Sequence, residues 1–156
     1  MYMSKYEKLS LASLVITLVA VITHHIFRFG FITPVIIPAI LGILLPFVLI
    51  LWFRQRKNKI ILWIYAGFTT VVFLLFSVED GFLDHVLKAF RLPHTGYLPG
   101  SQAQIVATTY HLWSVQATSN FYEITGILQT IVGIFAMYYC YRFLREEFKN
   151  QTKKIL

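Results

Sequence analysis

Residues 9–29 have the sequence LSLASLVITLVAVITHHIFRF, an apolar run that ends in two adjacent histidines and an arginine. A helix of about 20 apolar residues is long enough to cross the roughly 30 Å hydrocarbon core of a bilayer. Three further runs have this character, at residues 34–53, 60–78 and 121–143. The sequence therefore predicts an all-α, polytopic membrane protein with a four-transmembrane-helix bundle.

The composition supports a membrane protein and excludes several other classes. Hydrophobic residues make up 57% of the chain and charged residues only 13%, whereas soluble domains carry about 25% charged residues. The single cysteine, Cys140, excludes an internal disulfide and a CxxC redox motif. The net charge of +7 comes from short basic blocks beside the apolar runs, so the predicted partners are membrane lipids and not nucleic acid.

Basic residues gather in three regions, at residues 5–8, 54–59 and 142–154. Basic segments beside membrane helices stay on the cytoplasmic side. With four spans all three regions fall on that side, which places both termini in the cytoplasm and the connections 28–33 and 79–120 outside. We expect a multi-pass protein of a plasma membrane, such as a bacterial inner membrane.

Local sequence signals set the helix boundaries. Ser4 and Glu7 have the spacing of a capping box, which opens the first helix. No proline interrupts residues 59–90, so the third helix is expected to continue as an outer extension. A second capping box, Ser101 with Gln104, precedes apolar and aromatic residues and predicts a short amphipathic helix at the outer interface. The expected membrane helices are about 5–29, 34–53, 60–90 and 121–145, in a single domain, 1–156.

Ionisable residues cluster at the outer ends of these predicted helices. His24 and Arg28 continue a stripe of small and hydroxylated residues along the first helix. Asp80 and Asp84 do the same along the third helix at the α-helical period, and Glu123 opens the fourth. Ionisable groups at membrane depth are costly unless they face the bundle interior and have partners. The sequence therefore predicts an outward-facing polar site at this end of the bundle.

The charges in this site favour a bound divalent metal. One arginine faces three carboxylates, and the two aspartates are like charges four residues apart. Imidazole and carboxylate groups together suit Zn²⁺, Fe²⁺ or Mn²⁺. The predicted ligands are His24, Asp80, Asp84 and Glu123, with His25 and His85 as secondary candidates.

A metal at this depth would be positioned to act on a membrane-associated substrate. The sequence does not decide whether the protein is an enzyme, because no known catalytic motif accompanies the cluster. If it is one, the candidate catalytic residues are Asp80, Asp84, Glu123 and Arg28.

Three other interpretations stay open. Without metal, the same residues would relay protons or a ligand in a transporter or an accessory subunit, and four helices then imply a homo-oligomer or a larger membrane complex. The cluster would otherwise be a structural polar network, with Glu123 capping the fourth helix through the spacing Asn120-x-x-Glu123. Haem held between His24 or His25 and His85 is disfavoured by the neighbouring carboxylates.

Overall fold

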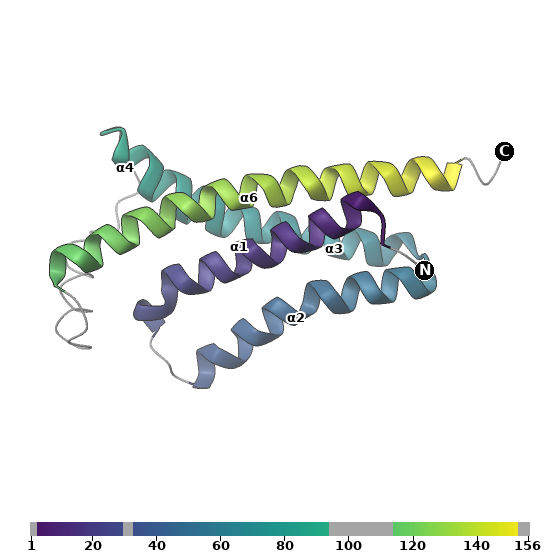
Figure 1. Cartoon of the computed structure of the whole chain (residues 1–156), viewed down its shortest axis with the longest axis horizontal. Coiled ribbons are helices and arrows are strands. Elements are labelled where there is room, and N and C mark those ends of the chain that lie inside the picture. Colours follow the sequence, from purple (N-terminus) through teal and green to yellow (C-terminus); the bar gives the residue numbers. More distant parts are fainter. Residues whose placement is uncertain (1–2, 30–32, 94–113, 153–156) are drawn as a thin grey trace.

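The computed structural model describes residues 3–29, 33–93 and 114–152 (Figure 1). Within these ranges 92% of the residues are helical and there is no strand. In chain order the elements are α1 (Lys5–Phe29), α2 (Thr33–Arg56), α3 (Lys59–Val72), η1 (Phe73–Val86), α4 (Leu87–Ala89) and α6 (Val115–Thr152).

Four helical segments are long and apolar enough to cross a membrane. Their outer faces carry large apolar side chains, such as Leu41 at 60% and Ile124 at 66% exposure, which suit lipid better than water. These features confirm the all-α prediction and its four long apolar helices. The predicted interfacial helix after Ser101 lies outside the described residues. The four segments are Lys5–His25, Ile37–Arg56, Lys59–Ala89 and Gln116–Asn150.

The long helix α6 is the centre of the bundle, because it packs along both α1 and η1 (Figure 1). Helix α2 packs against α1 and α3. The apolar core includes Leu14, Tyr65 and Phe143, all essentially inaccessible to solvent. Tyr65 and Phe143 meet edge to face, with their ring centroids 6.1 Å apart. This core holds together the half of the bundle that contains the start of α1 and the end of α6.

The predicted capping box at the start of α1 is confirmed. The Ser4 backbone N–H donates to Glu7 Oε2 at 3.1 Å, and the Glu7 backbone N–H donates to Ser4 Oγ at 3.3 Å. The buried Glu7 carboxylate also forms an ion pair with Arg54 of α2 at 3.7 Å. Ser4 Oγ donates to Glu146 of α6 at 2.6 Å. The first turn of α1 is thereby connected to two other helices.

The start of α1, the turn between α2 and α3 and the end of α6 lie at the same end of the bundle (Figure 1). We call this the basic end, because it carries the basic residues near 5–8, 54–59 and 142–149. In the turn, Lys57 adopts a φ of 50°, and the Asn58 side chain accepts a hydrogen bond from the Ile60 N–H at 2.8 Å. The predicted topology requires the three basic regions to lie on one side of the membrane, and their location at one end of the bundle meets this requirement. That this side is the cytoplasm stays a prediction.

The third long helix changes its winding halfway along. From Phe73 to Val86 it is a π-helix, and at its end the Leu87 N–H bonds to the carbonyl of Phe82, five residues back. A π-helix turns by less than the roughly 100° per residue of an α-helix, and π-helical segments often occur at functional sites. The buried residues of η1 are Ser77, Gly81 and His85.

Candidate metal site

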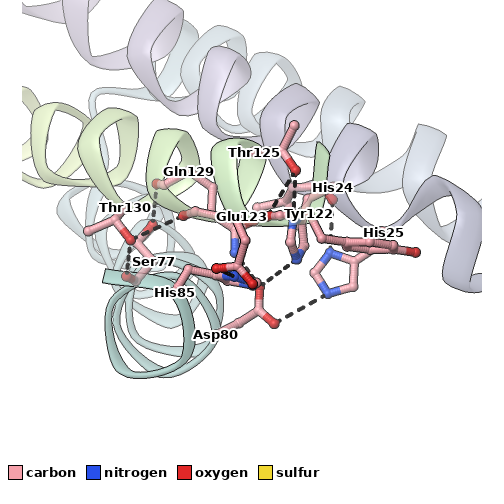
Figure 2. Close-up of polar contacts among 12 residues, drawn as sticks. His24, His25, Ser77, Asp80, His85, Tyr122, Glu123, Thr125, Gln129 and Thr130 are labelled. Carbon is pink, nitrogen blue, oxygen red and sulfur yellow. Dashed lines mark hydrogen bonds and ion pairs between the residues drawn. The ribbon is translucent and has the colours of Figure 1, made fainter. Parts of the chain in front are cut away.

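Three elements bring histidine and acidic side chains together at the end of the bundle opposite the basic end (Figure 2). Helix α1 contributes His24 and His25, η1 contributes Asp80 and His85, and α6 contributes Glu123. We call this region the histidine end. Its side chains come from positions up to about a hundred residues apart, as in the contact between His24 and Thr125, so tertiary packing assembles it.

His24, Asp80 and His85 form the one convergent group of potential metal ligands among the described residues. Taking one ligand atom from each residue, all three atoms lie within 4.8 Å of one another. His24 and His85 are buried, and the Asp80 side chain is 20% exposed. The group is geometrically able to bind a metal ion.

The hydrogen bonds around His24 favour one tautomer of its ring. Thr125 Oγ1 donates its own hydrogen to the Phe121 carbonyl at 2.6 Å, so it acts as an acceptor toward His24 Nδ1 at 2.8 Å. Nδ1 therefore carries the hydrogen. In a neutral ring, Nε2 then presents a lone pair toward Asp80 Oδ2, 3.5 Å away. A metal ion between these two atoms, or a proton on Nε2, would make the contact between them favourable.

The other two histidines follow the same pattern. His85 Nδ1 lies 3.2 Å from Glu123 Oε2, and His25 Nδ1 lies 2.9 Å from the Val21 carbonyl. A carboxylate and a carbonyl only accept, so both rings carry their hydrogen on Nδ1. Metal-ligating histidines commonly use one ring nitrogen for a carboxylate or carbonyl and the other for the metal.

Glu123 links the buried group to a cation nearer the surface. One carboxylate oxygen contacts His85, and the other accepts a hydrogen bond from Lys88 Nζ. Lys88 therefore pairs with Glu123. The alternative that Glu123 caps the fourth helix is wrong, because α6 begins well before it at Val115.

The π-helix changes which residues of the third helix face the interior. At the α-helical period Asp84 shares a face with Ser77 and Asp80, as predicted from the sequence. The smaller turn per residue in η1 accumulates along the segment and brings His85 inward, where it is 6% exposed. Asp84 is only partly buried and lies outside the convergent group.

The structure thus brings together His24 and Asp80 from the predicted ligands and His85 from the secondary candidates. His25 lies beside them, with Nε2 3.9 Å from Asp80 Oδ1. The side chain of Arg28 lies outside the described residues. The ligand role of each residue stays a prediction.

Close packing of η1 on α6 fixes the site. Ser77 Oγ donates to the Gln129 carbonyl and Thr130 Oγ1 donates to the Ser77 carbonyl, both at 3.0 Å. Gly126 allows the close approach, because a Cβ there would collide with the His85 ring. A Cβ at Gly81 would likewise collide with Thr130. These contacts leave His85 little freedom to move.

Two polar side chains of the site were not singled out from the sequence. Thr125 assigns the proton on His24, and Gln129 donates from Nε2 to Asp80 Oδ2. Gln129 stands between Leu128 and Thr130 in an apolar span. A polar side chain at such depth was the available signal, since buried polar groups in membrane helices require partners.

The charges of the described side chains around the site, a set that does not include Arg28, do not balance. The carboxylates of Asp80 and Glu123 face one ammonium group, that of Lys88, which leaves one excess negative charge among these three residues when the histidines are neutral. Burying an uncompensated charge is costly. A cation held at His24 and Asp80 would offset this charge.

Comparison of the chain with protein-family models, with curated proteins and with solved structures finds no match in any of the three.

Proposed function

We propose that the protein is an integral membrane protein that binds a divalent metal ion, Zn²⁺, Fe²⁺ or Mn²⁺, through His24, Asp80 and His85 at the outward-facing end of its bundle. The observation that carries this proposal is the convergence of the three ligand atoms within 4.8 Å. Two imidazoles and one carboxylate are a ligand set typical of catalytic zinc and non-haem iron.

The distance between His24 Nε2 and Asp80 Oδ2 supports an ion between them. At 3.5 Å it exceeds the roughly 2.7–3.2 Å of a direct N–H···O hydrogen bond. Two ligand atoms that each lie about 2.0–2.2 Å from one tetrahedral ion are roughly 3.4 Å apart. The pair therefore has the spacing of two ligands of one metal.

Such a metal would act as a Lewis acid at the outer end of the bundle. It would polarise a carbonyl or phosphoryl oxygen, or lower the pKa of a bound water so that the water attacks. A site between membrane helices is suited to a membrane-associated substrate. Lys88 and Glu123 would complete the surroundings, since Glu123 orients His85 and Lys88 holds Glu123.

A metal-free proton relay is the second candidate, and one specific observation favours it. Side-chain exposure falls along a connected chain of groups, from 31% at Lys88 to 25% at Glu123 and 8% at His85. Chains of acidic and histidine side chains at membrane depth carry protons in transporters and pumps. A proton on His24 would also remove its conflict with Asp80. In this case the protein would work in an oligomer or a larger complex.

Elemental analysis separates the two candidates. Purified protein incubated with Zn²⁺ and then desalted should retain about one metal ion per chain, which His24→Ala should abolish. His25→Ala is the matched control, because the adjacent histidine lies outside the convergent group, and it should retain the metal. Wild-type protein with no stoichiometric Zn²⁺, Fe²⁺ or Mn²⁺ would exclude the metal site and favour the relay.

The proposed orientation has its own test. In a Cys140→Ala background, single cysteines replace Thr95 and Asn150. An impermeant thiol reagent applied to intact cells should label position 95 and spare position 150, because the three basic regions hold the termini in the cytoplasm. Labelling of position 150 alone would reverse the orientation and place the histidine end inside.

A further inference from the structure

Gln129 is fully buried, and its two amide atoms have different surroundings. Nε2 donates a hydrogen bond to Asp80 Oδ2. Oε1 is buried and accepts no hydrogen bond from the described residues. Nearly all buried acceptors have a partner, and an acceptor without one destabilises the fold. The Oε1 atom is therefore suited to accept a hydrogen bond from a bound group.

The Gln129 amide adjoins the candidate metal site. Its Nε2 donates a hydrogen bond to the Asp80 carboxylate, one of the potential ligands. Asp80 Oδ2 is also the oxygen that faces His24 Nε2. The amide that carries the unpartnered acceptor therefore directly contacts one of the potential metal ligands.

Three protein ligands do not complete the coordination of Zn²⁺ or Fe²⁺. In catalytic sites with three protein ligands, water or substrate occupies the remaining position. A ligand that satisfies both the metal and Gln129 must have an oxygen lone pair for the metal and a hydrogen for Oε1. Water, hydroxide and a substrate hydroxyl group have both, whereas a fully deprotonated oxyanion lacks the hydrogen.

We propose that the metal centre is an open one, in which an exchangeable ligand with an O–H group binds the metal and donates a hydrogen bond to Gln129 Oε1. This inference rests on the proposed metal site and extends it from metal binding to ligand binding. Gln129 acts in two ways: its Nε2 orients Asp80, and its Oε1 selects a ligand that carries a hydrogen.

A closed structural site is the alternative, with His25 as the fourth protein ligand. His25 Nε2 lies 3.9 Å from Asp80 Oδ1, near enough to take the fourth coordination position in place of an exchangeable ligand. A closed site of four protein ligands would bind no exchangeable group. The open and closed sites therefore differ in their response to an added ligand.

The test uses Co²⁺ in place of the native metal and azide as the added ligand, with the full chain purified in detergent. The visible spectrum of bound Co²⁺ depends on its coordination. Addition of azide to the wild-type protein should change that spectrum in a saturable way. Bound Co²⁺ with a spectrum that azide leaves unchanged would overturn the open site while the metal site stands. Failure of Co²⁺ and Zn²⁺ to bind at all would overturn the proposed function itself, and this inference with it.

Gln129→Met tests the role of the amide. Azide has no hydrogen for Oε1, so in the wild-type protein it must displace a ligand that Gln129 stabilises. Without the amide, azide should bind the Co²⁺-saturated protein roughly five-fold more tightly, the equivalent of one hydrogen bond. The matched control is Gln116→Met, because Gln116 is an exposed glutamine of the same helix that bonds Asn120. Equal azide affinity in wild-type, Gln129→Met and Gln116→Met proteins would overturn the assigned role of Gln129.

Discussion

The two ends of the bundle each bury a carboxylate, and they satisfy it in different ways. At the basic end, Glu7 has the permanent charge of Arg54 and the backbone N–H of Ser4 as partners. At the histidine end, Asp80 faces His24 Nε2, which carries no hydrogen when the ring is neutral. The first arrangement pairs two opposite permanent charges, although Glu7 Oε1 accepts no hydrogen bond from the described residues. In the second, the Asp80 carboxylate has a neutral donor in Gln129 and would gain an opposite charge from a metal ion or from a proton on His24.

The difference in charge is accompanied by a difference in assembly. The contacts of Ser4 with Glu7 are local, three residues apart, and hold α1 at its first turn. The contacts of the histidine end connect three helices, as between His24 and Thr125 and between His85 and Glu123. We therefore expect changes to the charged side chains of the basic end to affect stability, and changes to those of the histidine end to affect metal affinity.

The largest expected effect comes from Asp80→Asn. Loss of partners outside the ligand set already costs roughly 10–100-fold in metal affinity, so loss of a charged ligand should weaken Zn²⁺ binding by about 100-fold or more. Competition with a zinc chelator measures this change. Asp84→Asn is the matched control, because it removes the same charge one turn away and outside the convergent group. Equal losses in the two variants would assign the effect to general charge and not to ligation.

Gly126→Ala should be next in size. The added Cβ would collide with the His85 ring, and overpacking of this kind destabilises proteins by about 1–3 kcal/mol. The free energy of unfolding in mixed detergent micelles is the measurement. Gly67→Ala adds the same methyl group where nothing lies within 4 Å and should not destabilise the protein by packing. A stable Gly126→Ala protein would mean that η1 and α6 are not as closely packed as described.

The pair Glu123→Gln and Glu7→Gln compares the carboxylates of the two ends of the bundle directly. Glu123→Gln should lower Zn²⁺ affinity by about 10-fold, because a neutral amide orients and polarises His85 less strongly than a carboxylate. Glu7→Gln should leave Zn²⁺ affinity unchanged and lower the free energy of unfolding, since it breaks the ion pair with Arg54. Calorimetric titration with Zn²⁺ measures the affinity, and unfolding in mixed detergent micelles measures the free energy of unfolding. A change in Zn²⁺ affinity in Glu7→Gln would show that the two ends are coupled.

Sequence reasoning predicted the features that depend on local chemistry or on composition. The four long apolar helices follow from their residues, and the capping box follows from the spacing of Ser4 and Glu7. The approach of His24 to Asp80 also followed from a simple rule, because polar groups in apolar helices turn toward one another.

The remaining features of the site depend on long-range packing. Periodicity at 3.6 residues per turn assigned Asp84 to the interior and left His85 a secondary candidate, whereas the π-helical winding of η1 buries His85 and leaves Asp84 partly exposed. The winding comes with close packing on α6 at Gly126 and Thr130, a contact between segments about fifty residues apart in the chain. No local sequence pattern in η1 predicts this packing. The interpretation that Glu123 caps the fourth helix failed for a related reason. The spacing Asn120-x-x-Glu123 lies inside a helix that begins earlier, at Val115.

The most direct test of the central claim is the X-ray absorption spectrum, at the metal edge, of purified protein loaded with Zn²⁺. Ligation by His24, Asp80 and His85 predicts a first shell of nitrogen and oxygen atoms at about 2.0–2.2 Å, with the outer-shell scattering of two imidazole rings. His24→Ala should remove the bound metal or reduce the scattering to that of one ring. A spectrum of fully hydrated Zn²⁺, or one without imidazole scattering, would contradict the account.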